Sequence, residues 1–376
     1  MKMQGENVRN GEIDFLRFLF SLIILLRHSS NIVGKRWYPF LGDAFAVEFF
    51  FLVSGYLMMA SIHKCLRGGD NCLLRRETVG FLTKKIKGFF PEMIIAWVLA
   101  LLINYVAREE KTIRGFLSML MDGFGEGSLL FMAGIGSTTF NVVVWYLSSM
   151  LISMAILYLL IRKYPDNMTK IILPVAVILM LGYLYQNYGT LRSPTQWIGF
   201  TYKGNIRAIS EISLGVIGYE IVQHFSPVQL NKKGKVLISD MKWCMYGVII
   251  AYMWFRSGDR RDYIFLFVFW FAVMCSFSQK GIEKNFFQNQ VCFFLGKFSL
   301  SIYLCHIFWA KNLNFLLTDI YSHAEKIGIY IICSFFIPKR FNNSVMLVST
   351  FLRKHTVSIK GRLKAFLYIQ NFINKG

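Results

Sequence analysis

The sequence predicts an all-α, polytopic membrane protein with about ten transmembrane helices. Three observations support this fold class. Of the 376 residues, 55% are hydrophobic and 16% are aromatic, which is more apolar than a soluble domain of this size. The apolar residues are gathered into blocks about as long as the hydrocarbon core of a bilayer is thick. Most of the 42 Lys and Arg residues, which give a formal net charge of +21, lie between those blocks.

Ten apolar blocks can be marked along the chain. They cover residues 13–30, 44–62, 89–107, 141–161, 171–188, 206–224, 244–256, 262–278, 292–310 and 326–338. The seventh and tenth blocks are short for a membrane span. We therefore expect one membrane domain, residues 1–338. A basic tail, 339–376, should follow it in the cytoplasm or on the anionic membrane surface.

The basic residues predict the orientation of the helices. With a cytoplasmic N-terminus and ten crossings, the Lys and Arg residues of the inside segments outnumber those outside by about two to one. The outside loop RSGDRRD (256–262) is the exception. No basic stretch accompanies a nucleic-acid-binding motif, so membrane lipid and a phosphorylated donor are the expected anionic partners, and nucleic acid is not one. The seven cysteines show no CxxC and no Cys/His spacing typical of a zinc site, so neither a metal site nor redox chemistry is expected.

The first apolar block contains an arginine and a histidine, Arg17 and His28, at its two ends. Eleven helical steps separate them by about 16 Å along the axis and by only about 20° around it, so both project from one face. Asp14 lies on roughly the same face. Ionisable groups inside a membrane helix suggest a functional site, and an imidazole can accept the proton of a hydroxyl group. The alternative is that Asp14 pairs with Arg17 at the boundary while His28 ends the helix in the outer interface.

The second block holds Glu48 and the small-residue element Ser54-Gly55-Tyr56. Glu48 lies at a depth similar to that of His28 if the two helices are antiparallel neighbours. It could orient the imidazole, hold a protonated partner or simply lie in the interface. The Ser-Gly pair could admit an acyl chain, or it could serve tight helix packing.

Three further groups are candidates for binding. The basic segment 63–88 contains Lys84, Lys85 and Lys87, which could bind the phosphates of coenzyme A. Positive-inside topology would also explain them. Trp145 begins the fourth span. Tyr303 and His306 share a face in the ninth span at a spacing of three residues.

Taken together, these segments resemble the acyltransferase 3 family of bacterial membrane acyltransferases. IDFLRFLFSLIILLRH (13–28) is similar to the family's first-helix motif of an arginine, ten residues and a histidine. VEFFFLVSGYLM (47–58) resembles its FFxxSGY element, and KKIKGFFP (84–91) its basic entry to the third helix. SLSIYLCHIFW (299–309) is similar to its late YLxH element. The likeness covers about residues 12–340.

The resemblance implies a multi-pass protein of the bacterial cytoplasmic membrane that transfers an acyl group, usually acetyl, from cytoplasmic acetyl-CoA. The acceptor would be a sugar hydroxyl of a surface polysaccharide or lipid-linked glycan. No tightly bound cofactor is implied, because acyl-CoA is a substrate. By this resemblance His28 would be the catalytic base or transient acyl acceptor, and Arg17 would help to bind the donor. The SGY element would line the path of the acyl group.

Two departures from the family pattern are visible. Lysines replace the arginines common at the entry to the third helix, and the last apolar block is short and broken by Pro338-Lys339-Arg340. Two other functions stay open. A transporter or flippase for lipid-linked sugars would also use intramembrane charges, but it would predict paired Gly/Pro-broken helices. A membrane-bound O-acyltransferase of the lipid-modifying type would differ in its acceptor.

Overall fold

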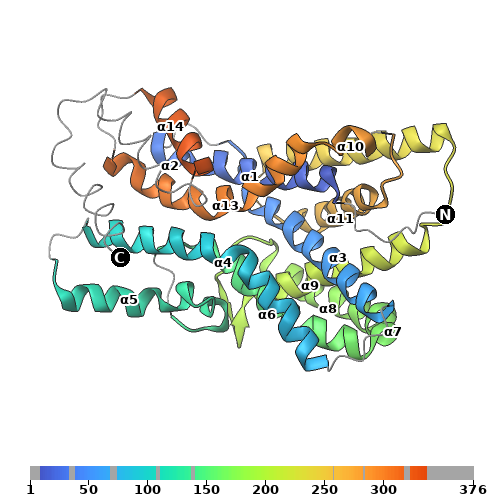
Figure 1. Ribbon diagram of the computed structural model, residues 1–376, viewed down its shortest axis with the longest axis horizontal. Helices are drawn as coiled ribbons and strands as arrows, with labels where there is room; N and C mark the ends of the chain where they lie inside the picture. Colours follow the sequence, from blue (N-terminus) through green and yellow to red (C-terminus); the bar gives the residue numbers. More distant parts are fainter. Residues whose placement is uncertain are drawn as a thin grey trace.

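The computed structural model describes residues 9–33, 39–67, 74–106, 111–136, 140–256, 258–282, 284–316 and 322–336. Its longer helices, arranged as in Figure 1, are α1 (Gly11–His28), α3 (Ala46–Arg67), α4 (Leu74–Val106), α5 (Ile113–Gly127), α6 (Val144–Lys163), α8 (Leu173–Tyr188), α9 (Lys203–His224), α10 (Lys232–Phe255), α11 (Asp262–Ser278), α13 (Gln290–Leu316) and α14 (His323–Phe336). The short elements are α2 (Ser30–Val33), η1 (Asp43–Phe45), η2 (Phe131–Ala133), α7 (Pro165–Asn167), the π-helical turn η3 (Met168–Ile172), α12 (Lys284–Phe287) and a hairpin of β1 (Trp197–Ile198) and β2 (Thr201–Tyr202).

Each of the ten predicted apolar blocks overlaps a helix in the part of the chain that the structure describes, so the all-α membrane fold is confirmed. Within the described residues, six helical segments are long and apolar enough to cross a membrane. They are Asp43–Arg67, Leu74–Val106, Val144–Lys163, Pro165–Tyr188, Lys232–Phe255 and Gln290–Asn314. The predicted tail, 339–376, lies outside the described residues.

Two predicted boundaries were wrong for the same physical reason. The seventh block, 244–256, is only the apolar half of α10, whose polar first half brings it to 24 residues. The basic segment 63–88 is mostly helical, because α3 runs on to Arg67 and α4 begins at Leu74. Lys and Arg are good helix formers, so a helix can continue past the point where its hydropathy ends.

The helices α1 and α9 are the polar helices of the interior. Asp14 and Arg17 lie on α1, and Arg207 and Glu211 lie on α9. α1 packs against α13 and α3, while α9 packs against α3, α6 and α8. Both therefore contribute their charged groups to the inside of the bundle, where such groups can find partners. By contrast, α8 and α10 expose apolar side chains such as Ile178, Leu179 and Val248, as lipid-facing helices do.

The crossing of α3 and α9 is a backbone-to-backbone contact. A Cβ atom built on Gly55 would lie 2.0 Å from the carbonyl oxygen of Ile212, and one built on Gly215 would lie 2.2 Å from that of Leu52. Only glycine allows helices to approach this closely. The prediction that the Ser-Gly pair could serve tight packing is therefore met at Gly55.

An amphipathic helix that the sequence analysis did not identify, α5, lies beside α4 (Figure 1). The chain that follows α5 packs against the interior of the protein, where buried polar side chains form hydrogen bonds with its backbone groups. Glu126 accepts the backbone N–H groups of Phe140 and Asn141 at 3.1 and 3.0 Å, and Asn205 donates to the carbonyl of Met132 at 2.7 Å. These bonds allow irregular backbone to lie against α6 and α9.

Candidate active site

His28 ends α1, and the short turn η1 places a carboxylate beside it. Nε2 of His28 lies 3.6 Å from Oδ2 of Asp43. Two guanidinium groups approach the same carboxylate: Nε of Arg27 is 3.8 Å from Oδ1, and a terminal nitrogen of Arg192 is 3.9 Å from it. These distances exceed those of hydrogen bonds but allow direct electrostatic attraction. The arrangement thus gives the imidazole an anionic neighbour on one side.

A second imidazole lies against His28. The ring of His306, on α13, lies 5.0 Å from it, centroid to centroid. His306 is fully buried, and its Nδ1 lies 3.1 Å from the carbonyl oxygen of Ile302. Since a carbonyl can only accept, Nδ1 carries the proton and Nε2 keeps its lone pair. Among the described residues, Nε2 of His306 makes no hydrogen bond.

Two tyrosine side chains extend the contact between His28 and His306 into the helix bundle. Tyr303 lies 5.9 Å from His306, and Tyr146 lies 5.6 Å from Tyr303, both measured between ring centroids. Tyr303 donates to the carbonyl of Val143 at 3.0 Å, and the hydroxyls of Tyr146 and Ser54 are 3.4 Å apart. A polar line of side chains, His28, His306, Tyr303, Tyr146 and Ser54, therefore passes between α1, α13, α6 and α3.

Arg17 lies at the other end of α1 from His28. It pairs with Asp14 at 3.5 Å, and Asp14 also binds Arg9. Arg17 is close enough to Tyr146 and Lys85 to interact electrostatically with both. The predicted face of α1 thus has Arg17 near the basic start of α4 at one end and His28 near Asp43 at the other.

The three candidate lysines lie about three to four turns after the start of α4. Lys84 and Lys87 are exposed, while Lys85 is half-buried and lies over the ring of Phe81 at 5.6 Å. The exposed ammonium groups of Lys84 and Lys87 could bind phosphate oxygens as point charges.

Glu48 does not lie at His28. It is fully buried and paired with Arg207 of α9, which also bonds Glu211 at 3.2 Å. Trp145 packs on the same arginine, whose guanidinium carbon is 5.5 Å from the indole ring. Of the alternatives left open for Glu48, the structure places it with a protonated partner, and neither Glu48 nor Asp14 has a contact with the imidazole.

The residues of the SGY element point in different directions, as consecutive residues of a helix must. Ser54 faces Tyr146, and Gly55 faces α9. The ring of Tyr56 stacks on Phe277 with centroids 3.6 Å apart. Of the three, Ser54 alone contributes to the polar line.

Sequence reasoning missed Asp43, Arg192 and Arg207. Asp43 directly precedes an apolar block, and Arg207 stands with Glu211 at the i,i+4 spacing inside one, so both left a signal. Arg192 lies in a loop and left none. The described residues contain no group of three His, Cys, Asp or Glu side chains that could hold a metal ion.

The fold and this constellation define an integral membrane protein with ionisable groups along an interior face. A model of the acyltransferase domain of the acyltransferase 3 family matches residues 10–351. The chain belongs to that family and is a multi-pass membrane acyltransferase. No curated protein and no solved structure matches it.

Proposed function

We propose that the chain transfers an acetyl group from cytoplasmic acetyl-CoA to a sugar hydroxyl of a surface polysaccharide or lipid-linked glycan, in the bacterial cytoplasmic membrane. The observation that carries the proposal is the pairing of His28 with Asp43 at one end of a helix whose other end presents Arg17 beside Lys85. Family membership supports acyl transfer. The acetyl group and the sugar are our proposals.

The end of α1 that carries Arg17 suits the binding of the acyl donor, acetyl-CoA. Phosphates of coenzyme A would bind to Arg17 on α1 and to Lys84, Lys85 and Lys87 on α4, of which Lys85 lies close enough to Arg17 to interact with it. The extended pantetheine arm would then carry the thioester along the polar line toward His28, about 16 Å further along α1. Within that line the hydroxyls of Ser54 and Tyr146 can donate hydrogen bonds to a polar thioester, whereas Tyr303 and His306 already donate to the carbonyls of Val143 and Ile302.

The end of α1 that carries His28 suits the transfer of the acyl group to a hydroxyl. Our mechanism places the proton of the neutral imidazole on Nε2, the nitrogen that lies 3.6 Å from Asp43, which leaves the lone pair of Nδ1 to take the proton of the sugar hydroxyl. The hydroxyl oxygen forms a bond to the acyl carbon, the carbon–sulfur bond breaks, and the thiolate of coenzyme A receives the proton. Alternatively, Nδ1 first accepts the acyl group and then passes it to the hydroxyl. Asp43 would stabilise the imidazolium in either case.

The test is the acetyl content of surface polysaccharide, measured by proton NMR in cells that express the wild-type chain, His28→Ala or His323→Ala. His323 is an exposed histidine on α14 and serves as the control. Acetyl signals should vanish for His28→Ala and persist for His323→Ala at equal protein abundance. Retained acetylation in His28→Ala would contradict the proposal. Membrane vesicles that consume no acetyl-CoA would favour a transporter or flippase instead.

A further inference from the structure

Two acidic side chains share one arginine inside the bundle. Arg207 of α9 pairs with Glu48 of α3, and its Nε lies 3.2 Å from Oε1 of Glu211. All three side chains are fully buried. Glu211 directly precedes Ile212, whose carbonyl oxygen meets Gly55 at the crossing of α3 and α9, so the two helices hold these groups at close range. Two acids therefore face one cation away from bulk solvent.

The groups around this trio do not remove the imbalance of charge. Five other titratable side chains from the helices packed around it interact electrostatically with one or more of its members: Lys203 on α9, Asp262 and Tyr263 on α11, Tyr146 on α6 and Tyr303 on α13. The tyrosines are neutral near neutral pH. Lys203 and Asp262 are both buried and carry opposite charges, so they balance each other. With every acid ionised, this part of the described interior would hold three negative charges against two positive ones.

One oxygen of each acid in the trio has no hydrogen-bond donor. Oε2 of Glu48 and Oε2 of Glu211 are buried, and neither makes a hydrogen bond among the described residues. The two carboxyl groups are nevertheless close enough to hydrogen-bond to each other. Two carboxylates only accept, so no such bond can form while both are ionised, whereas a protonated carboxyl group can donate its O–H to a carboxylate. One proton would therefore join the two acids.

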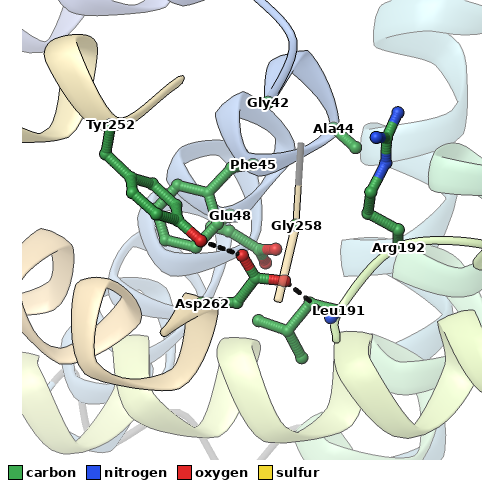
Figure 2. Close-up of a pocket in the computed structure, with 9 residues that line it drawn as sticks. All are labelled: Gly42, Ala44, Phe45, Glu48, Leu191, Arg192, Tyr252, Gly258 and Asp262. Atoms are coloured by element: carbon green, nitrogen blue, oxygen red, sulfur yellow. Dashed lines mark hydrogen bonds between the residues drawn. The ribbon is translucent and has the colours of Figure 1, made fainter. Parts of the chain in front are cut away.

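A water molecule is the competing partner for Glu48. The hollow lined by Glu48, Arg192 and Asp262 (Figure 2) has room for about one water molecule. Such a water could donate to Oε2 of Glu48 and leave both acids of the trio ionised. It would not serve Glu211, which does not line the hollow. Nor does Arg192 supply the missing charge, because it is partly exposed and lies 3.9 Å from the carboxylate of Asp43. A shared proton, by contrast, satisfies both acids at once.

We propose that Glu48 and Glu211 bind one proton between them at neutral pH, as an acid–carboxylate pair held by Arg207. Like charges at close range cannot both be buried in the ionised form without a large cost, and a pair of carboxyl groups that shares one proton avoids that cost. Glu48 has no contact with the imidazole of His28, so this proton is separate from the one that acyl transfer moves. The bound proton stabilises the crossing of α3 and α9, and its loss at high pH would leave two like charges there.

The first test detects the bound proton directly, by the infrared C=O absorption of protonated carboxyl groups, which is distinct from that of carboxylates. It uses the purified full-length chain in deuterated buffer at neutral pH. Glu48→Gln and Glu211→Gln should each remove one carboxyl equivalent from this band, because the remaining acid then ionises beside Arg207. Glu77→Gln is the matched control, since Glu77 faces one arginine, Arg162, at 3.0 Å, and it should remove none. A band that neither Glu48→Gln nor Glu211→Gln changes would overturn the proposal and leave both acids ionised, as a water beside Glu48 requires.

The second test uses the stability of the same variants. An amide in place of one acid can still donate to the other, so each single variant should melt within a few degrees of the wild type at neutral pH. The double variant Glu48→Gln/Glu211→Gln should be lost from the membrane fraction, because Arg207 then has no anionic partner there. Single variants that are lost as completely as the double one would contradict the shared proton.

The pH dependence of melting separates a bound proton from a purely structural contact. Between about pH 6 and pH 8 the folded wild type holds a proton that the unfolded chain releases, so its stability should fall as the pH rises, by a factor of ten in the unfolding constant per pH unit. Glu211→Gln holds no such proton and should lack this contribution. Parallel melting curves for the wild type and Glu211→Gln across this range would overturn the proposal.

Discussion

The crossing of α3 and α9 at Gly55 gives a prediction whose size follows from the geometry. In Gly55→Ala, the new Cβ would lie 2.0 Å from a backbone oxygen of Ile212, whereas real Cβ contacts stay beyond 3.0 Å. Backbone cannot rotate away as a side chain can, so the two helices must separate by about 1 Å. Such overpacking costs about 1–3 kcal/mol. Alanine returns about 0.5–1 kcal/mol through its better helix propensity.

The expected net loss is therefore about 1 kcal/mol, within a range of about 0–2.5 kcal/mol. It should appear as a fall of a few degrees in the temperature at which half the detergent-purified protein leaves the monodisperse peak on size-exclusion chromatography. Gly182→Ala on α8 and Gly247→Ala on α10 are matched controls, because a Cβ at either position meets nothing within 4 Å. Both should melt at or slightly above the wild-type temperature.

The crossing also predicts coupling between the two glycines. Once Gly55→Ala has separated the helices, Gly215→Ala should cost less than it does alone, so the double variant should be less destabilised than the sum of the single ones. The reasoning is refuted if Gly55→Ala melts with the Gly182→Ala control.

Three further predictions concern charged groups. Asp43→Asn should lower kcat by roughly 10–100-fold, since the imidazolium loses its anionic partner, with little change in the KM for acetyl-CoA; Asp43→Glu should recover part of the rate. An unchanged kcat for acetyl transfer from acetyl-CoA in membrane vesicles would exclude this role of Asp43. Arg207→Met should lower the folding stability by about 3–5 kcal/mol, because the buried carboxylates of Glu48 and Glu211 lose their cation. The loss should be seen as less protein in the membrane fraction, and wild-type abundance would show that these ion pairs are dispensable. Lys85→Ala should raise the KM for acetyl-CoA several-fold and Lys85→Arg should not; equal values for the two variants would argue against donor binding at α4.

The parts of the fold that were predictable are those that depend on local sequence. Hydropathy located the six described helical segments that are long and apolar enough to cross a membrane. A helix that crosses a bilayer satisfies its own backbone and must be apolar where it meets lipid. It failed where α10 extends through polar residues and where α5 mixes apolar and polar faces. A helix outside the hydrocarbon, or one packed against protein, does not need a continuous apolar run.

What the sequence by itself determined about the site is the content of single helices. Arg17 and His28 belong to one unbroken helix, so helical geometry alone sets their spacing along it. Which groups meet from different helices was decided by the tertiary structure. Asp43 reaches His28 because η1 returns to the end of α1, and Arg207 takes Glu48 because two glycines let α9 approach α3. Those contacts depend on how helices that are far apart in the chain pack against one another, and this packing cannot be predicted from a local pattern in one sequence.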